Sequence, residues 1–296
     1  MDHLSFLQAI VIGFVQGITE LFPVSSLGHS VLIPAWLGGS WQSLVTQESS
    51  PESPYLAFIV GLHVATALAL LIVFRRDWVK IITGFFTTVR NRRIETVHER
   101  LAWLIIIATI PVGIAGLVLE HLLRTVFAKP LAASIFLTLN GLILFAGERL
   151  RRRVPGAVEA DESRTDTDDD IVHKVRPFDA AWVGTLQIGA LFAGISRSGI
   201  TMVGGLLRGL SHEEAVRFSF LLATPVIFAA GVYKVPDLFG PLGNGIRPQV
   251  IVGSIVAFVA SYFAATFLVR WFKTRTLIPF GVYCVVFGLV SAVHFS

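Results

Sequence analysis

Long runs of apolar residues dominate this chain and decide its fold class. Six of them are long enough for a helix to cross a bilayer, which takes about 20 apolar residues. They cover residues 55–74, 101–120, 127–147, 213–235, 248–270 and 277–295. Only 15% of the 296 residues are charged, against roughly 25% in soluble domains. We therefore predict an all-α polytopic membrane protein.

Two further apolar regions, residues 5–38 and 178–209, are interrupted in the middle by Pro, Gly and Ser. The interruptions leave pieces that include some too short to cross a membrane alone. Non-helical backbone at membrane depth is tolerated only where protein or a water-filled cavity surrounds it. Each region is therefore predicted to be a re-entrant helical hairpin with its polar break at the tip.

The distribution of Lys and Arg predicts the orientation. If the six spans alternate in direction, 19 of these residues fall on one side and 4 on the other. The richer side, which includes the segments 75–100 and 149–176, is cytoplasmic by the positive-inside rule. A hairpin does not change the side of the chain, so both ends are expected to face outward. The first residues lack the basic segment of a cleaved signal peptide, so the spans themselves are expected to direct insertion.

The two interrupted regions match when the sequence is shifted by 171 positions. Gln16 then falls on Gln187, Ser25 on Ser196, and Gly28 on Gly199. Three spans follow each copy, so the second half runs upside down relative to the first. We predict one membrane domain over residues 1–296, built from two inverted-topology repeats. Repeat one covers 1–148, a cytoplasmic linker covers 149–177, and repeat two covers 178–296.

Two charged residues, Glu20 and Arg197, lie in the middle of the interrupted regions. Ionisable groups at membrane depth are costly and usually line a substrate path. A buried ion pair that only locks the two hairpins together is the alternative. Gln16 lies one helical turn before Glu20, so both present oxygen atoms on the same face. This pair suits a hard divalent cation such as Mg²⁺ or Ca²⁺.

Hydroxyl residues follow each break where a new helix is expected to begin. Free N–H groups at a helix N-terminus bind anions, and a guanidinium binds phosphate in the same way. A phosphate site is therefore predicted between the two tips. Its candidate binding residues are Ser25, Ser196, Arg197, Ser198 and Thr201.

Two histidines are candidates for acid–base chemistry. His29 lies one turn after Ser25 and Ser26, where it is placed to act as a general base or acid for a hydroxyl or a water. His63 lies in the span 55–74 with Thr66, and either reaches the site or only hydrogen-bonds within the bundle.

Several other features favour ordinary roles. The net charge of +4 comes from loop residues rather than from a basic face, which argues against a nucleic-acid partner. Cys284, the only cysteine, is expected to be buried and inert. The acidic segment 154–176 is predicted to be a solvated linker. His212 and the other histidines near loops are expected to be solvated.

The segment 16–29 resembles the first signature of the undecaprenyl-diphosphatase family, the bacitracin resistance proteins. It contains Gln16-x-x-x-Glu20 followed by Pro-Val-Ser-Ser-Leu-Gly-His. The segment 194–201, Gly-Ile-Ser-Arg-Ser-Gly-Ile-Thr, resembles the second signature. Their spacing and order agree with the family over the whole chain.

This resemblance implies a phosphatase of the bacterial cell membrane that hydrolyses undecaprenyl diphosphate, with a site open to the outer face and a divalent cation as cofactor. Such an enzyme recycles the lipid carrier of peptidoglycan synthesis and confers bacitracin resistance. The resemblance assigns Gln16 and Glu20 to metal binding, with Glu20 also catalytic. It assigns Ser26 as the nucleophile and His29 as the catalytic histidine. It assigns Arg197 and its neighbouring hydroxyls to the diphosphate.

Three positions depart from the family pattern. Gln16 stands where many members have Glu, which removes one charge from a metal site. Leu27 replaces a small hydroxyl residue, and Ala193 replaces the Pro that opens the second signature. None of the three removes a group that we regard as essential.

Some alternatives stay open from sequence. Either Ser26 or a water attacks the phosphate. A flippase or transporter for polyprenyl phosphate lipids has the same inverted architecture, so the polar residues rather than the fold favour an enzyme. The substrate and the surrounding lipid are the expected partners, and the chain is either a monomer or a homodimer.

Overall fold

The computed structural model describes residues 4–44, 53–127, 129–154, 167–240 and 243–296. Within these ranges every regular element is a helix, and no strand occurs. The order is α1 (Phe6–Thr19), α2 (Ser26–Leu37), η1 (Gly39–Trp41), α4 (Pro54–Val73), α5 (Arg75–Asn91), α6 (Val97–Phe127), α7 (Pro130–Arg151), α8 (Thr167–Lys174), α9 (Pro177–Leu186), η3 (Gln187–Leu191), α10 (Arg197–Leu206), α11 (His212–Phe239), α12 (Arg247–Trp271) and α13 (Ile278–His294).

Four helices in the described part of the chain are long and apolar enough to cross a membrane. They are α7, α12, the Val97–Leu119 part of α6 and the His212–Val232 part of α11. Helix α4 adds a fifth if it is taken with α5 as one span, although the two helices bend by 89° where they meet. Helix α13 is apolar but has only 17 residues. The predicted all-α membrane fold is confirmed at this level.

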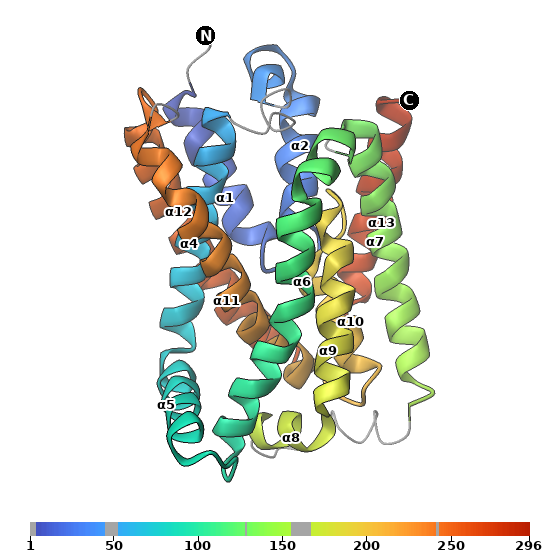
Figure 1. Cartoon of the computed structure of the whole chain (residues 1–296). Helices are drawn as coiled ribbons and strands as arrows, with labels where there is room; N and C mark the ends of the chain where they lie inside the picture. Colours follow the sequence, from blue (N-terminus) through green and yellow to red (C-terminus); the bar gives the residue numbers. More distant parts are fainter. Residues whose placement is uncertain (1–3, 45–52, 128, 155–166, 241–242) are drawn as a thin grey trace.

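Two helix pairs turn back inside the bundle (Figure 1). Helix α1 runs inward from the end of the bundle where the chain terminates, and α2 returns to that end. Helix α9 runs inward from the opposite end, and α10 returns there. The turns are close enough that a Cβ added to Gly28 would lie 3.0 Å from the Cα of Gly194.

Small residues let α1 lie directly against α12. A Cβ added to Gly13 would lie 2.5 Å from the Gly253 carbonyl oxygen, and one added to Gly17 would lie 2.5 Å from the Ala257 oxygen. Such Gly-x-x-x-Gly faces let helix backbones approach closely in membranes. The Ser261 hydroxyl donates to the Gly17 carbonyl at 3.1 Å. The end of α1 is thereby fixed on α12.

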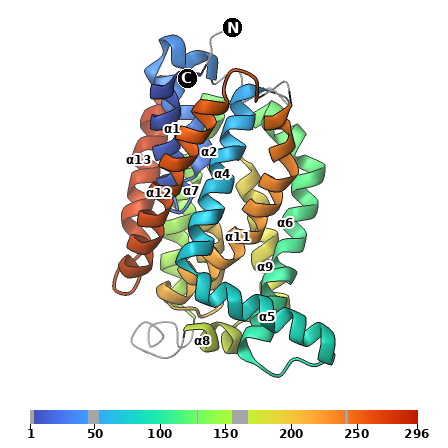
Figure 2. The same cartoon turned by 90° about the vertical axis from the view of Figure 1, so that its left-hand side faces the viewer.

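Helices α5 and α8 lie at one end of the bundle (Figure 2), and acidic residues of both pair there with an arginine of α11. Arg217 on α11 donates through Nε to Asp168 at 2.6 Å and contacts Asp77 at 2.9 Å. Asp168 is 4% exposed. The prediction of a wholly solvated linker is therefore wrong for α8, because its Asp168 is buried and pairs with an arginine of the bundle. Residues 155–166 of the linker lie outside the described residues.

His212 was also expected to be solvated, and this expectation is wrong. Its side chain is buried, and its Nε2 lies 2.8 Å from Glu148 Oε1 on α7. The same carboxylate oxygen accepts from the backbone N–H of Leu277 at 2.6 Å. The place of His212 near a loop in the sequence could not show that α7, the start of α11 and the residue before α13 meet at this carboxylate.

Candidate active site

The first tip follows from the residues at the end of α1. Glu20 caps this helix with its N–H bonded to the Gln16 carbonyl at 3.0 Å. Pro23 has no N–H and disfavours a helical conformation in the residue before it. Ser25 then begins α2 as its N-cap, with a φ of 70°. This left-handed conformation is uncommon outside glycine, so surrounding contacts must hold it.

Those contacts come from α2 itself and from the second tip. The Ser25 hydroxyl accepts hydrogen bonds from the N–H of Gly28 at 3.2 Å and from the N–H of Gly194 at 3.1 Å. Gly194 has a φ of 113°, and a Cβ there would lie 2.5 Å from the Ala133 oxygen. Only glycine satisfies both the conformation and the space at this turn.

Asn140 on α7 joins the two tips from the side. Its Nδ2 donates to the Pro23 carbonyl at 2.9 Å, and its Oδ1 accepts from the Ser196 N–H at 2.9 Å. The Phe22 carbonyl accepts from the Ser198 hydroxyl at 3.1 Å. Backbone groups in both turns therefore have hydrogen-bond partners within the protein.

The structure brings Glu20 and Arg197 together where the two tips meet, a place that we call the junction. Nη2 of Arg197 donates a short hydrogen bond to Glu20 Oε1, and Nη1 donates to the Ala223 carbonyl at 3.2 Å. The Glu20 side chain is 7% exposed and that of Arg197 is 13% exposed. The carboxylate is thus neutralised by a cation from the other tip.

The second carboxylate oxygen of Glu20 is surrounded by three side chains. Ser26 donates a short hydrogen bond to Oε2, and Gln16 Nε2 donates to it at 3.1 Å. Nε2 of His63 lies 3.4 Å from the same oxygen. Of the site residues predicted from sequence, Gln16, Glu20, Ser26 and Arg197 therefore form one cluster.

His29 has different partners. Its Nδ1 lies 2.7 Å from the Ser25 carbonyl, and its Nε2 lies 2.7 Å from the Tyr283 hydroxyl. A carbonyl only accepts, so Nδ1 carries the proton and Nε2 accepts from Tyr283. The ring also packs against the rings of Tyr283 and Phe287 of α13, with centroids 5.7 and 5.6 Å away. The hydroxyl of Ser26 is bonded to Glu20 instead.

The remaining predicted phosphate ligands use their hydroxyls within the protein. Thr201 is 1% exposed, and its Oγ1 lies 2.6 Å from the Ser219 hydroxyl on α11. The Ser196 hydroxyl caps α10 by accepting from the Gly199 N–H at 3.1 Å. These hydroxyls, like those of Ser25 and Ser198, hold the tips in place.

The donor set does not fit a resident divalent cation in this arrangement. Among the described residues no three His, Cys, Asp or Glu side chains cluster as metal ligands. Glu20 is the one carboxylate here, and hydrogen-bond donors and His63 face both of its oxygens. Gln16 presents its amide nitrogen, not its oxygen, to that carboxylate.

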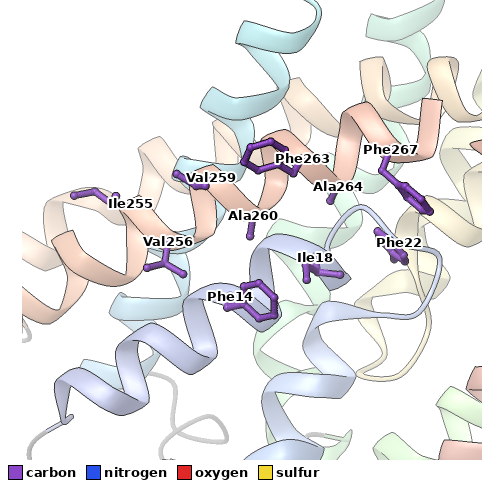
Figure 3. A pocket seen from close by; sticks show the side chains of 10 residues that line it. All are labelled: Phe14, Ile18, Phe22, Ile255, Val256, Val259, Ala260, Phe263, Ala264 and Phe267. Atoms are coloured by element: carbon purple, nitrogen blue, oxygen red, sulfur yellow. The ribbon is translucent and has the colours of Figure 1, made fainter. Parts of the chain in front are cut away.

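An apolar groove of about 460 Å³ runs between α1 and α12 beside the first tip (Figure 3). Phe14, Ile18 and Phe22 line one side, and Val259 and Phe267 lie on the other. The rings of Phe22 and Phe267 stack with centroids 5.9 Å apart. Because the Phe22 carbonyl bonds Ser198, one residue borders both the groove and the polar junction.

The sequence matches a known protein family and proteins within it. The family model of the bacitracin resistance protein BacA matches residues 9–290. The chain belongs to the BacA family. It is 58% identical to the undecaprenyl-diphosphatase of Mycolicibacterium paratuberculosis, over 98% of this chain and 97% of that protein. It is 54% identical to undecaprenyl-diphosphatase 2 of Frankia alni, over 100% and 99% of the two chains.

Three residues at the junction of this BacA-family chain were not assigned to it from sequence. Asn140 and Tyr283 were missed, and His63 was left open. Asn140 had a usable signal, because it is a lone amide within an apolar run and interhelical hydrogen bonds favour such residues. Tyr283 had none, since its place in a predicted span does not show which residue its hydroxyl contacts.

We expect Asn140→Ala to destabilise the protein by about 2–4 kcal/mol, because it leaves the Pro23 carbonyl and the Ser196 N–H buried without their partner. Thermal unfolding of the purified protein in detergent measures this loss. Ser134→Ala on the same helix is the control, since that hydroxyl only bonds the Pro130 carbonyl of its own helix. Equal melting temperatures for the two variants would show that Asn140 does not join the tips.

Proposed function

We propose that this chain hydrolyses undecaprenyl diphosphate to undecaprenyl phosphate and inorganic phosphate in the bacterial cell membrane. The observation that carries this proposal is the Ser26 hydroxyl, which donates to a carboxylate that also binds Arg197. A hydroxyl, a proton acceptor and a cation for phosphate are thereby adjacent. Relatives named undecaprenyl-diphosphatase cover nearly the whole chain. Its product is the lipid carrier that peptidoglycan synthesis reuses, and its activity confers resistance to bacitracin.

Arg197 and two helix N-termini are the proposed binding site for the diphosphate. A guanidinium has five N–H donors, of which Glu20 and the Ala223 carbonyl each occupy one. Helices α2 and α10 begin at Ser26 and Arg197, and their N-termini favour a negative charge. Phosphoryl transfer depends mainly on such positioning and charge stabilisation.

Ser26 is the proposed nucleophile, and Glu20 is the proposed acceptor of its proton. The Ser26 oxygen forms a bond to the terminal phosphorus. The bond from that phosphorus to the bridging oxygen breaks, and its electron pair leaves with undecaprenyl phosphate. Water then hydrolyses the phosphoserine. His29 is proposed to serve this step by holding the Ser25 carbonyl, next to the nucleophile, through Nδ1.

A divalent cation, Mg²⁺ or Ca²⁺, is proposed to enter with the substrate rather than to reside in the protein. Mg²⁺ sites commonly use one or two carboxylates together with substrate phosphates. Gln16 and Glu20 are the proposed protein ligands once the diphosphate competes for the donors around the carboxylate. When bound, the cation offsets the charge of the phosphate oxygens.

The finer architecture is also a proposal. We infer two inverted repeats, 1–148 and 178–296, joined by the cytoplasmic linker 149–177. Each contains a re-entrant hairpin followed by three spans. The support is that the two hairpins run inward from opposite ends of the bundle (Figure 1), while Arg217 and other basic residues gather at one of those ends. The site is proposed to open toward the other, outer face.

The apolar groove between α1 and α12 is the proposed binding site for the prenyl chain. It lies on helices of the membrane domain, and it ends at Phe22, whose carbonyl belongs to the junction. A lipid whose diphosphate reaches Arg197 can place its first isoprene units there.

The decisive assay measures phosphate released from undecaprenyl diphosphate by the purified full-length protein with Mg²⁺ or Ca²⁺. We expect release to stop when the cation is chelated. Arg197→Ala should lower kcat/KM by about 100-fold or more, as expected for loss of a preorganised charge stabiliser. Arg208→Ala is the control, because Arg208 on the same hairpin pairs with Asp179 away from the junction. A wild-type protein that releases no phosphate would instead favour a flippase.

The identity of the nucleophile is tested separately. We expect rapid acid quenching during turnover to trap a phosphoserine at Ser26, because the covalent route passes through this ester. Ser26→Ala should yield no phosphoenzyme and no turnover, whereas Ser30→Ala should keep both. Full activity of Ser26→Ala would show that water attacks the phosphate directly.

The groove predicts where the prenyl chain binds. Val259 lines the groove and is 46% exposed, so Val259→Trp fills the groove without disturbing the core. We expect KM for undecaprenyl diphosphate to rise about tenfold, corresponding to roughly 1.4 kcal/mol. Val286→Trp on α13, which lies outside the groove, is the control. An unchanged KM in Val259→Trp, or an equal rise in both variants, would place the prenyl chain elsewhere.

A further inference from the structure

Helix α5 does not follow the direction of the bundle. It comes directly after α4, and the two helices bend by 89° where they meet. The 20 residues of α4 rise about 30 Å, which is enough to cross the hydrocarbon core without α5. Figure 2 shows α5 running sideways across one end of the bundle. A helix at a right angle to a span lies along the membrane surface.

One face of α5 is held by protein. The buried residues of the helix follow helical spacing and are Ile81, Gly84 and Thr88. A Cβ added to Gly84 would lie 3.0 Å from the backbone nitrogen of Glu99 on α6, so the two helices touch there. The Asp77 carboxylate contacts Arg217 of α11 at 2.9 Å. The placement of α5 across the end of the bundle is therefore a property of the fold.

A second face of α5 is apolar and exposed. We call it the apolar stripe, and its members are Val79, Ile82, Phe86 and Val89, which are 66%, 48%, 65% and 53% exposed. Positions i, i+3, i+7 and i+10 lie on one side of a helix. Exposed apolar residues on the spanning helices face the acyl chains of the bilayer. The apolar stripe lies outside those helices, and an apolar surface of this kind marks a site of interaction.

Basic residues run along one edge of the apolar stripe. At about 100° per residue, Arg76, Lys80 and Arg90 fall on one strip of the helix, and all three are exposed. We call these three residues the basic strip. Other basic residues at this end, such as Arg217 and Lys174, pair with carboxylates. None of the ion pairs between described residues includes a member of the basic strip.

The surroundings of the basic strip leave its charge uncompensated. The segment 75–100 contains seven Lys and Arg residues against three Asp and Glu residues. Of these acids, Asp77 contacts an arginine of α11. The Glu99 carboxylate accepts from the N–H groups of Glu95 and Thr96 at 2.6 and 3.1 Å. The surface that α5 presents is therefore positive, and it complements the phosphate groups of anionic lipids.

We propose that α5 is an interfacial helix that binds anionic phospholipid headgroups at its end of the bundle. The apolar stripe enters the boundary between headgroups and acyl chains, where amphipathic helices with basic polar faces bind. The basic strip meets the lipid phosphates beside it. A second protein chain would be served by the apolar stripe alone, whereas the unpaired positive edge favours a headgroup. In the orientation proposed above, these lipids belong to the cytoplasmic leaflet.

This surface shares no residue with the junction. Lipid binding by α5 therefore does not depend on the proposed phosphatase activity, and it can be measured whether or not the protein releases phosphate. The contacts that hold α5 to α6 and α11 use its other face, so changes in the apolar stripe or the basic strip leave those contacts in place.

The test uses the full-length protein in phosphatidylcholine vesicles, with a bimane fluorophore attached to Phe86→Cys. The native Cys284 is buried and does not compete for the label. The vesicles contain the same small fraction of nitroxide-bearing phosphatidylglycerol or nitroxide-bearing phosphatidylcholine. We expect both lipids to quench the label, because it lies at the level of the lipids. The anionic lipid should quench it about threefold more strongly, because basic residues near the surface attract anionic headgroups.

Two matched proteins locate the effect. In the labelled chain, Arg76→Gln, Lys80→Gln and Arg90→Gln together should abolish the preference for phosphatidylglycerol while quenching by phosphatidylcholine persists. Val293→Cys carries the same label on α13, where the residue is 78% exposed at the opposite end of the bundle (Figure 1). The two lipids should quench that label equally. An equal preference at Val293 would show that α5 is not the binding surface.

Salt provides a test that does not require the triple variant to fold. The screening length falls from about 10 Å at 0.1 M ionic strength to about 3 Å at 1 M, so the preference should shrink in the chain with its native basic strip. Equal quenching by the two lipids at low salt, or a preference that survives both 1 M salt and the triple substitution, would overturn the proposal. A label at Phe86 that neither lipid quenches would overturn it too, because water or protein would then cover the apolar stripe.

Discussion

The ion pair between Glu20 and Arg197 is the interaction on which the rest of the junction depends. Each charge comes from a different hairpin, and both are largely buried. Breaking a buried pair by removing one partner is strongly destabilising, because it leaves an uncompensated charge. The two turns therefore cannot separate without exposing or stranding a charge. Their contact in turn places Ser26, Gln16 and His63 around one carboxylate oxygen.

The turns also need partners for their backbone groups, since non-helical backbone in a membrane must be satisfied by protein. Asn140 and Ser198 supply partners for the Pro23 and Phe22 carbonyls. This requirement explains why most of the predicted phosphate-binding hydroxyls bond within the protein. The anion site that we propose therefore consists of the helix N-termini and Arg197, which these hydroxyls hold in place.

The sequence predicted the helical membrane fold and placed Glu20 and Arg197 as the two charges of the apolar regions. It did so because hydropathy is a local property and a charge in an apolar run stands out. It did not predict the partners of His29, because helical spacing shows which residues share a face but not which helix lies opposite. For the same reason His212 and Asp168 were expected in solvent, although Glu148 and Arg217 from distant segments cover them.

Glu20 has two requirements that conflict. As the counter-ion of Arg197 it must stay ionised, whereas in its proposed role as the acceptor from Ser26 it must take up a proton. A change such as Glu20→Gln therefore removes a fold contact and a chemical group at once, and its effect on activity cannot be divided between them. Arg197 favours the ionised state of the carboxylate by binding one of its oxygens, while Gln16, Ser26 and His63 surround the other oxygen.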